Sequence, residues 1–154
     1  MHAKAQRVAD TLENLGVRTE VRELDSSTRT SQDAADSIGT TVSQIAKSLL
    51  FLAGEQPVLV IASGTNRVSV DAVGELLDAE LTQPDAKTVK KRTGYSVGGV
   101  PPVAQNEPAT VVIDEDLFRY EVVWAAAGTP NAVFSVTPDE LRRVTGGTVA
   151  KVAG

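Results

Sequence analysis

The fold follows from one stretch of sequence, Ile45-Ala46-Lys47-Ser48-Leu49-Leu50-Phe51-Leu52-Ala53-Gly54-Glu55-Gln56-Pro57-Val58-Leu59-Val60-Ile61-Ala62. It contains two apolar runs, 45–53 and 58–62, separated by the turn-prone residues 54–57. Two such runs around a short polar link predict a β-hairpin at the centre of the fold.

The segments on either side of this hairpin show helical and extended patterns in irregular order. Apolar stripes and capping residues predict helices at 3–15, 31–38 (capped by Thr30), 69–78, 84–92 (with Pro84 in the first turn) and from Thr137 onward. Further strands are predicted at 17–24, 109–113, 121–127 and 132–136. This mixture favours a mixed-sheet α/β or α+β fold over a doubly wound parallel sheet.

Length and composition indicate one soluble domain that spans residues 1–154. The 154 residues are enough to bury a full core, and 42% of them are hydrophobic and 23% charged. Cysteine is absent and the one histidine is His2, beside the start of the chain. These facts argue against disulfides, a thiolate nucleophile, a Ser-His-Asp triad and a His- or Cys-based metal site. We therefore expect no cofactor and no metal.

The charge balance restricts the partners that the sequence predicts. Fifteen Lys and Arg residues against 20 Asp and Glu give a net charge of −5. This disfavours a DNA-binding protein that relies on general electrostatics. No apolar run is long enough for a membrane span, and residues 1–15 do not form a signal-peptide core. We therefore expect a cytoplasmic protein without membrane contact.

Lys47 is the first candidate functional residue. In an extended segment it shares a face with the apolar residues Ile45, Leu49, Phe51 and Ala53. An ammonium group on such a face is costly unless it is paired or reaches a cavity. Two explanations stay open: the side chain extends along the apolar surface to water, or it is functional, either as a binder of an anion or a carbonyl group or as an amine with a depressed pKa.

Two loops are the next candidates. The first is Gly94-Tyr95-Ser96-Val97-Gly98-Gly99-Val100-Pro101-Pro102, where glycines allow close approach of a ligand and prolines stiffen the chain. It lacks the patterns of a P-loop and of a dinucleotide fingerprint, so it is either a polar-ligand loop or a plain connector. The second is the turn 127–131, where Asn131 could exchange hydrogen bonds at a pocket rim or simply shape the turn.

A short basic segment follows Pro84. Residues 85–95 carry Lys87, Lys90, Lys91 and Arg92 against Asp85, a local charge of +3. On a helix, 87, 90 and 91 share one face. The face is either solvated or a phosphate-contacting patch beside the glycine loop.

The order of these pieces carries a family resemblance. The pieces are Thr30-Ser31-Gln32-Asp33-Ala34-Ala35, Gln44-Ile45-Ala46-Lys47-Ser48-Leu49, the 94–102 loop, the Gly128 turn and Thr137-Pro138-Asp139-Glu140-Leu141. This order resembles the YbaK/EbsC family of aminoacyl-tRNA editing domains, related to the insertion domain of bacterial prolyl-tRNA synthetases. The similarity covers about residues 17–152, and the lysine followed by the Gly-Gly-x-x-Pro loop is its specific part.

The resemblance implies a fold, an activity and site residues. The fold would be a curled, barrel-like mixed β-sheet surrounded by helices, and the activity hydrolysis of the ester between a wrong amino acid and the tRNA 3′ end. Lys47 would be the key lysine, which positions the terminal adenosine or phosphate. Gly98, Gly99, Val100, Pro101 and Pro102 would clasp the aminoacyl group, with Thr30 and Gly128 also in the substrate site. Asn131 stands where several members carry Asp or His, and an amide cannot act as a general base.

Three hypotheses follow from the sequence. The first is a free-standing trans-editing deacylase, with Cys- or Ala-tRNA(Pro) among its substrates. The second is a non-catalytic module that binds an aminoacylated tRNA 3′ end or a nucleotide-like ligand. The third is an interaction domain that docks on a tRNA synthetase. In the first, Lys87, Lys90, Lys91 and Arg92 are candidate tRNA contacts.

Overall fold

The predicted hairpin is the centre of the sheet. In the computed structural model, which describes residues 1–25, 28 and 30–154, strand β2 (Ile45–Ala53) pairs antiparallel with β3 (Gln56–Ser63). The register runs from Ala46 opposite Ser63 to Ala53 opposite Gln56. The turn is therefore Gly54-Glu55, shorter than predicted, because β3 begins two residues before Val58. Gly54 takes a positive φ of 62°, which suits glycine in a two-residue turn.

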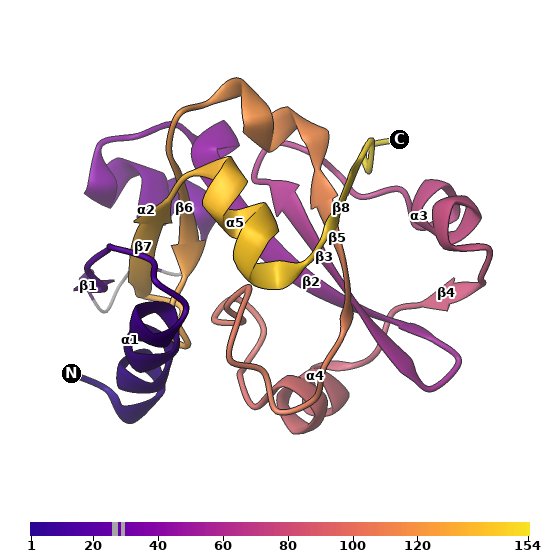
Figure 1. The fold of residues 1–154 in the computed structure, drawn as a ribbon, viewed down its shortest axis with the longest axis horizontal. Helices are drawn as coiled ribbons and strands as arrows, with labels where there is room; N and C mark the ends of the chain where they lie inside the picture. Colours follow the sequence, from indigo (N-terminus) through magenta and orange to yellow (C-terminus); the bar gives the residue numbers. More distant parts are fainter. Residues whose placement is uncertain (26–27, 29) are drawn as a thin grey trace.

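Parallel pairings extend the hairpin into a mixed sheet of eight strands within the described residues. The other strands are β1 (Arg22–Glu23), β4 (Leu81–Thr82), β5 (Thr110–Asp114), β6 (Val123–Ala126), β7 (Ala132–Val136) and β8 (Thr148–Ala150). Their order is β1-β7-β6-β2-β3-β5-β8, with β4 paired to β2 beside this path. The pairs β2–β6, β3–β5 and β5–β8 are parallel. The predicted mixed α/β fold is confirmed, and the sheet stays open between β1 and β8 (Figure 1).

Five helices pack around this sheet in the described part of the chain. They are α1 (Ala3–Asn14), α2 (Ser31–Ile38), α3 (Val70–Leu77), α4 (Ala86–Thr93) and α5 (Pro138–Thr145), with 3₁₀ turns η1 (Val42–Gln44) and η2 (Glu115–Arg119). Thr30, Ser69 and Thr137 cap their helices as predicted. None of these helices combines the length and apolar character that crossing a membrane requires.

Two further local predictions were wrong. The alternating segment 17–24 forms a strand only at Arg22–Glu23, and at its start the Val17 N–H instead donates to the Leu12 carbonyl of α1. Pro84 does not open α4. Asp85 is the N-cap, accepts the N–H of Thr88, and leaves Pro84 one residue before the cap.

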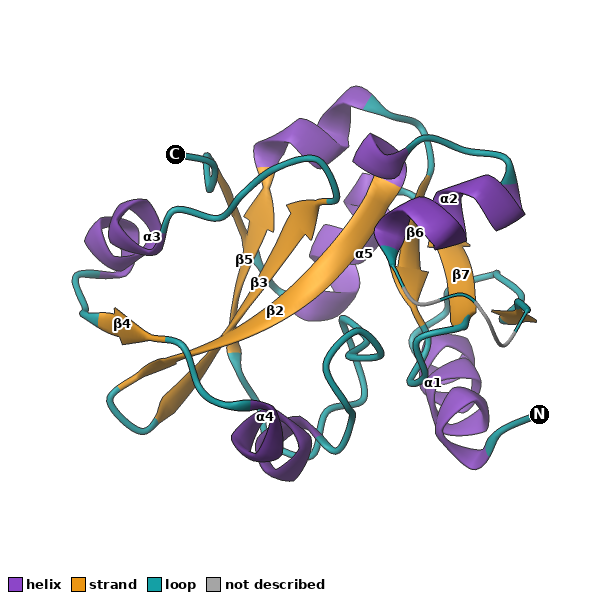
Figure 2. Cartoon of the chain, turned by 180° about the vertical axis from the view of Figure 1, so that it is seen from behind, coloured by secondary structure: helices purple, strands orange, loops and turns teal. Residues whose placement is uncertain are grey.

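Three apolar clusters fix how the helices sit on the sheet. The largest joins α1, α5 and the loop 95–103 to the sheet, and the second packs α3 against β2, β3 and β5. The third joins Ala34 and Ala35 of α2 to Ile45 at the start of β2, with Trp124 of β6 beside them. This last contact holds the N-terminal end of α2 near Lys47. Figure 2 shows α2, β6 and β7 at one end of β2, and α3 and β4 at the other.

Candidate functional site

A cavity of about 270 Å³ lies where α2, β2, β6 and the glycine loop meet. It exceeds by far the ~30 Å³ share of one water and is large enough for a small organic group. Its described lining residues come from five segments and are Thr30, Ser31, Ala34, Ile45, Ala46, Lys47, Ser48, Leu49, Val97, Gly98, Val100, Trp124, Ala125, Ala126, Pro130 and Val133. Because β2 and β6 pair in parallel at Ile45 and Trp124, residues distant in sequence share one wall.

Glycines let the 97–100 loop and the 128–130 turn form a common wall. Gly98 has φ +90° and Gly128 φ +93°, a region that other residues rarely adopt. A Cβ on Gly99 would lie 3.0 Å from backbone atoms of Thr129, and one on Gly128 would lie 2.9 Å from the carbonyl oxygen of Lys4. The Gly128 N–H donates to the Gly99 carbonyl over 3.0 Å. The two segments therefore touch backbone to backbone.

Buried polar contacts hold the rest of the glycine loop. The Tyr95 hydroxyl donates to the carbonyl of Ala104 over 2.7 Å, and the Gln105 side chain donates to the carbonyl of Pro101. The Arg7 guanidinium lies 5.6 Å from the centre of the Tyr95 ring. Burial raises the pKa of Tyr95, with the nearby charge of Arg7 acting in the opposite direction. Tyr95 thus fixes the loop as a neutral hydrogen-bond donor.

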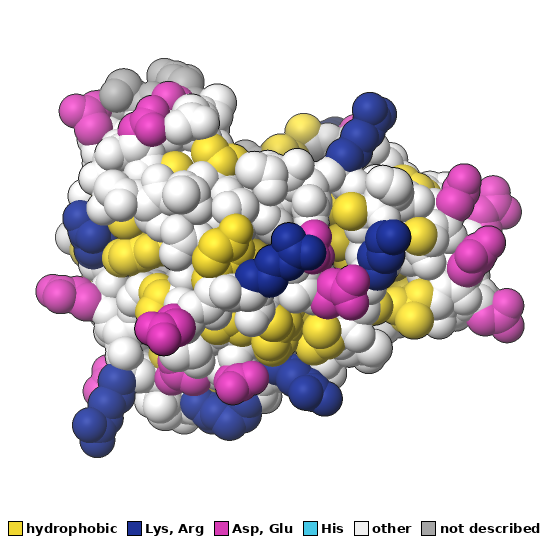
Figure 3. Space-filling view, turned by 90° about the horizontal axis from the view of Figure 1, so that it is seen from above, with side chains coloured by type: hydrophobic (Ala, Val, Ile, Leu, Met, Phe, Trp, Pro, Cys, Tyr) yellow, Lys and Arg dark blue, Asp and Glu magenta, His cyan; other side chains and the backbone are white. Residues whose placement is uncertain are grey.

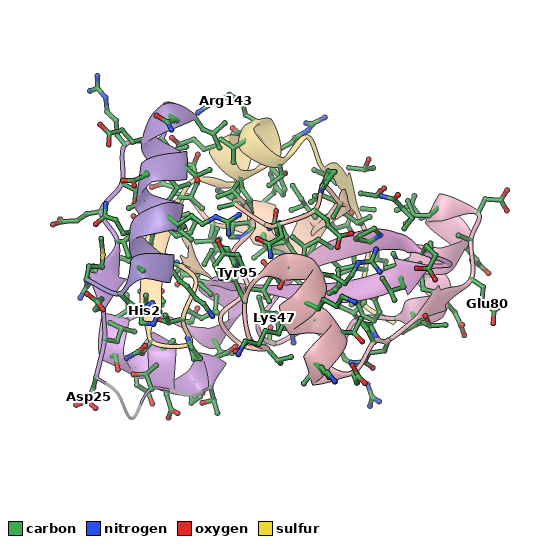
Figure 4. All side chains as sticks on the ribbon, turned by 90° about the horizontal axis from the view of Figure 1, so that it is seen from below. His2, Asp25, Lys47, Glu80, Tyr95 and Arg143 are labelled. Carbon is green, nitrogen blue, oxygen red and sulfur yellow. The ribbon has the colours of Figure 1, made fainter. Side chains whose placement is uncertain are left out.

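Lys47 brings a positive charge to this cavity. Its side chain is partly buried, and within the described residues its ammonium has neither a hydrogen-bond partner nor a carboxylate within 4.0 Å. Burial lowers the pKa of Lys47, and the charge of Asp114 partly opposes this effect. Figure 4 labels Lys47 near the middle of the molecule seen from below (Figure 4). An unpaired ammonium in a cavity is available to an anionic or carbonyl ligand.

Asp114 is held firmly at the end of β5. It is 1% exposed and accepts hydrogen bonds from the Ser63 N–H, the Asn66 side chain and the Asp116 N–H. Lys47 pairs with Ala62 on β3, and Asp114 follows Ile113, the partner of Ile61. The sheet register thus places a buried negative charge two strands from Lys47, outside the cavity lining.

The rest of the lining is uncharged. Thr30, Ser31 and Ser48 carry hydroxyl groups, and most other members are apolar. No Asp, Glu, His or Cys occurs among the described lining residues. The N-terminal end of α2 has the positive end of a helix dipole, and the Asp33 carboxylate in its first turn lies against that end. The site can bind and polarise a carbonyl or phosphate group, but its described lining offers no carboxylate or imidazole as a general base.

The negative charge of the chain lies partly at the other end of the molecule. Residues 71–80 contain Asp71, Glu75, Asp78 and Glu80 and no basic residue. Seen from above, acidic side chains gather at the end that carries α3 and β4, and others lie at the opposite end (Figure 3).

The structure brings some of the predicted site residues together and leaves others apart. Thr30, Lys47, Gly98 and Val100 line the cavity, whereas Gly99 and Gly128 hold its wall from behind. The remaining loop and turn candidates, Pro101, Pro102 and Asn131, do not line it.

Asn131 is engaged in the turn itself. Its side chain accepts a hydrogen bond from the Thr129 hydroxyl over 3.0 Å and donates to the Leu24 carbonyl over 3.4 Å. Its carbonyl accepts the Leu24 N–H. This residue therefore joins the β6–β7 turn to the segment after β1.

The basic residues of α4 behave in two ways. Lys87, Lys90 and Lys91 are exposed. The Arg92 side chain lies close to Glu107, with 2.9 Å from Nε to each carboxylate oxygen, and also donates to the Glu55 carbonyl. The Arg92 side chain is therefore bound within the protein, whereas the three exposed lysines are accessible to a polyanion.

Sequence reasoning did not single out Val97, Trp124 or Ser48 as site residues. Val97 is 58% exposed although it is apolar, and Trp124 carries the Arg22 guanidinium 5.5 Å from its ring centre. Trp124 is the one tryptophan of the chain, a signal that could have drawn attention to 121–127. Its place in the cavity depends on the parallel pairing of β6 with β2, which no local pattern reveals.

Comparison with known families identifies the family of this chain. Residues 25–144 match the model of the aminoacyl-tRNA editing domain, and this range contains all the predicted site residues. The chain belongs to this family. The predicted resemblance to YbaK-type editing domains is therefore confirmed.

Three similar proteins differ in how much of their length this chain matches. A crystal structure described as "a putative trans-editing enzyme for prolyl tRNA synthetase" is 41% identical and superposes with a TM-score of 0.97 over 100% of this chain and 99% of the other. The uncharacterized protein YwhH of Bacillus subtilis is 32% identical over 123 residues, 79% of this chain and 78% of YwhH. The proline–tRNA ligase of Lactobacillus helveticus is 34% identical over 102 residues, 65% of this chain but 18% of the ligase.

Proposed function

We propose that this editing domain is a trans-acting deacylase that hydrolyses the ester of mischarged aminoacyl-tRNA, with Ala- and Cys-tRNA(Pro) as the leading substrates. The observation that carries the proposal is the unpaired ammonium of Lys47 in a cavity walled by the glycine loop. The family match and the prolyl-tRNA synthetase relatives support the choice of tRNA.

The reaction needs little chemistry from the protein. Water adds to the ester carbonyl carbon, the bond to the ribose oxygen breaks, and that oxygen takes a proton that the water gives up. The products are the free amino acid and the tRNA with its terminal hydroxyl restored. Because the ester is activated, a positioned water and a stabilised oxyanion are sufficient. The absence of a carboxylate or imidazole among the described lining residues fits a role in positioning rather than in proton transfer.

Lys47 and the helix end define how the substrate enters. The ammonium attracts the phosphate or carbonyl oxygens of the 3′ terminus, and the Thr30 and Ser31 side chains at the start of α2 line the same cavity. The volume of about 270 Å³ favours a small aminoacyl group, while the body of the tRNA stays outside. Lys87, Lys90 and Lys91 on α4 are proposed to contact the tRNA backbone weakly.

A panel of mischarged tRNAs tests this function. The purified protein is incubated with Ala-, Cys-, Ser- and Pro-tRNA(Pro), and release of each amino acid is compared with the spontaneous rate. We expect Ala- or Cys-tRNA(Pro) to be hydrolysed and Pro-tRNA(Pro) to be spared. Hydrolysis that is no faster than the spontaneous rate for every member would disprove the proposal.

The alternative is a module that binds the aminoacylated 3′ end without turnover. The absence of a carboxylate or imidazole among the described lining residues favours it. It predicts saturable binding of a non-hydrolysable aminoacyl-adenosine amide, abolished in Lys47→Ala, with no amino acid released. Lys151→Ala is the matched control, since Lys151 is an exposed lysine outside the cavity.

A further inference from the structure

One edge of β2 is open between two short pairings. Strand β3 covers the other edge along its length, from Ala46 to Ala53. On the open side, β6 pairs only at 45–46 and β4 only at 52–53. Within the described residues, no strand pairs with this side of residues 47–51. Figure 2 shows β6 and β4 beside opposite ends of the long β2 arrow.

The hydrogen-bond pattern tells which main-chain groups point to the open side. In an antiparallel pair, residues alternate between facing the partner strand and facing away from it. The Ile45 carbonyl accepts the Gly64 N–H over 2.8 Å, so 45, 47, 49 and 51 face β3. The Leu52 carbonyl instead accepts the Thr82 hydroxyl of β4, which places the even-numbered residues on the outer side. The N–H and C=O of Ser48 and Leu50 therefore point to the open edge.

Ser48 is the residue through which this edge meets the cavity. Leu50 is 6% exposed and belongs to the core, whereas Ser48 lines the cavity and is only partly buried. Its Oγ, by contrast, is buried and has no hydrogen-bond partner in the described structure. The exposed surface of Ser48 therefore belongs to its main chain and Cβ, and a rotation about χ1 would turn the hydroxyl toward the same edge.

An unpartnered hydroxyl is costly to bury, and a ligand that bonds to it removes that cost. The neighbouring Lys47 makes the potential at this edge positive, so an oxygen that gains negative charge suits it better than an ammonium group. When water adds to an ester, the electron pair of the carbonyl bond moves onto the carbonyl oxygen. Hydrogen-bond donors that are already placed at the position of this oxygen stabilise the transition state more than the ground state.

We propose that Ser48 is a substrate-binding residue whose main-chain N–H and hydroxyl both donate hydrogen bonds to the carbonyl oxygen of the aminoacyl ester. The proposal rests on the deacylase function above. As the intermediate collapses, the oxygen returns its electron pair to the carbon and the ribose oxygen leaves with a proton from the added water.

Two substitutions separate the two donors. Ser48→Ala removes the hydroxyl and keeps the N–H. Ser48→Pro also removes the N–H, but no β2–β3 hydrogen bond is lost because this N–H faces away from β3, as proline on a strand edge requires. Since both variants lack Oγ, Ser48→Ala is the matched control for the missing N–H.

The expected kinetics are specific to a transition-state contact. For Ser48→Ala, we expect kcat to fall roughly three- to tenfold with an unchanged or higher Tm, since an unpaired buried hydroxyl is lost. For Ser48→Pro, kcat should fall by about a further hundredfold, the loss typical of one oxyanion donor. If Ser48→Ala keeps kcat within twofold of the wild type, or loses activity only in step with its Tm, the proposal is overturned. This criterion applies even if Ser48→Pro does not fold.

A binding measurement separates failure of this proposal from failure of the deacylase function. If the wild type hydrolyses no tRNA of the panel, the proposed deacylase function is wrong. In that case the affinity for the aminoacyl-adenosine amide tests whether Ser48 contacts the carbonyl group. Weaker binding of the amide by Ser48→Ala then supports Ser48 as a carbonyl contact, and equal binding overturns it. If the wild type is active and both variants are equally active, only the Ser48 proposal fails.

Discussion

Replacing Gly128 by alanine tests how the two loops build the cavity wall. Gly128 has φ +93°, and a Cβ there would lie 2.9 Å from the carbonyl oxygen of Lys4 and 3.0 Å from its carbonyl carbon. Both are backbone atoms and cannot turn away as a flexible side chain would. Either the turn or the first turn of α1 must therefore move.

The expected loss of stability is the sum of three contributions. The positive φ costs about 1–2 kcal/mol for alanine, and the forced contact adds about 1–3 kcal/mol. The reduced freedom of the unfolded chain returns about 0.4–1 kcal/mol. The free energy of unfolding should thus fall by about 3 kcal/mol. Gly16→Ala is the matched control, because Gly16 has φ +77° with nothing within 4 Å of a Cβ, and it should lose only about 1 kcal/mol.

Urea unfolding and ligand affinity are the two measurements. The Gly128 N–H holds the Gly99 carbonyl at 3.0 Å, so a displaced turn also displaces the 97–100 wall. Affinity for the aminoacyl-adenosine amide should fall at least about tenfold in Gly128→Ala, equivalent to about 1.4 kcal/mol, and stay near the wild-type value in Gly16→Ala. Equal stability of the two variants would refute the reasoning, as would wild-type affinity in Gly128→Ala.

Three further predictions follow from the charges. Affinity for the amide should weaken as pH rises through the pKa of Lys47, which lies below its ordinary value. In Lys47→Arg the affinity should no longer weaken over this pH range, because arginine stays protonated. If the arginine variant shows the same pH dependence as the wild type, Lys47 is not the titrating group. Arg92→Ala should lower the free energy of unfolding by about 1–2 kcal/mol in urea melts, because the contact of Arg92 with Glu107 is lost. Lys90→Ala, at an exposed position, should change it by less than about 0.5 kcal/mol. Equal effects of the two substitutions would contradict a stabilising Arg92–Glu107 contact. In a plot of log(kcat/KM) against log salt concentration, the slope should be shallower than about −3, because at most about four phosphate contacts are proposed. A steeper slope would indicate that the protein contacts more of the tRNA backbone.

The lowered pKa of Lys47 also determines how the free energy of unfolding changes with pH. Because burial lowers the folded-state pKa of Lys47, the unfolded chain binds more protons in the pH range between the two pKa values. Stability should therefore rise with pH across that range, which ends at the ordinary pKa of lysine. This rise should be missing in Lys47→Ala, as pH-dependent urea melts would show.

Local patterns were enough to predict the elements that carry their own signals. The hairpin 45–62 was predicted from apolar runs, and α2, α3 and α5 from Thr30, Ser69 and Thr137, because caps and apolar periodicity act within a few residues. Strands β4 and β8 were missed, since two or three residues are too few to show a period.

The cavity could be predicted only in part for a similar reason. Lys47 and the Gly98 loop stood out as a cation on an apolar face and a glycine pair, and both line it. Trp124 and Ser48 enter it through non-local geometry: the parallel pairing of β6 with β2, and the edge that this pairing leaves open. Strand pairing of this kind is decided by the whole sheet, not by local sequence.

The rate of amino-acid release from Ala-tRNA(Pro) under single-turnover conditions tests the central claim most directly. The wild type and Lys151→Ala should release alanine much faster than the spontaneous rate, while folded Lys47→Ala should not exceed it. Wild-type hydrolysis by Lys47→Ala would contradict the assignment of the cavity as the editing site.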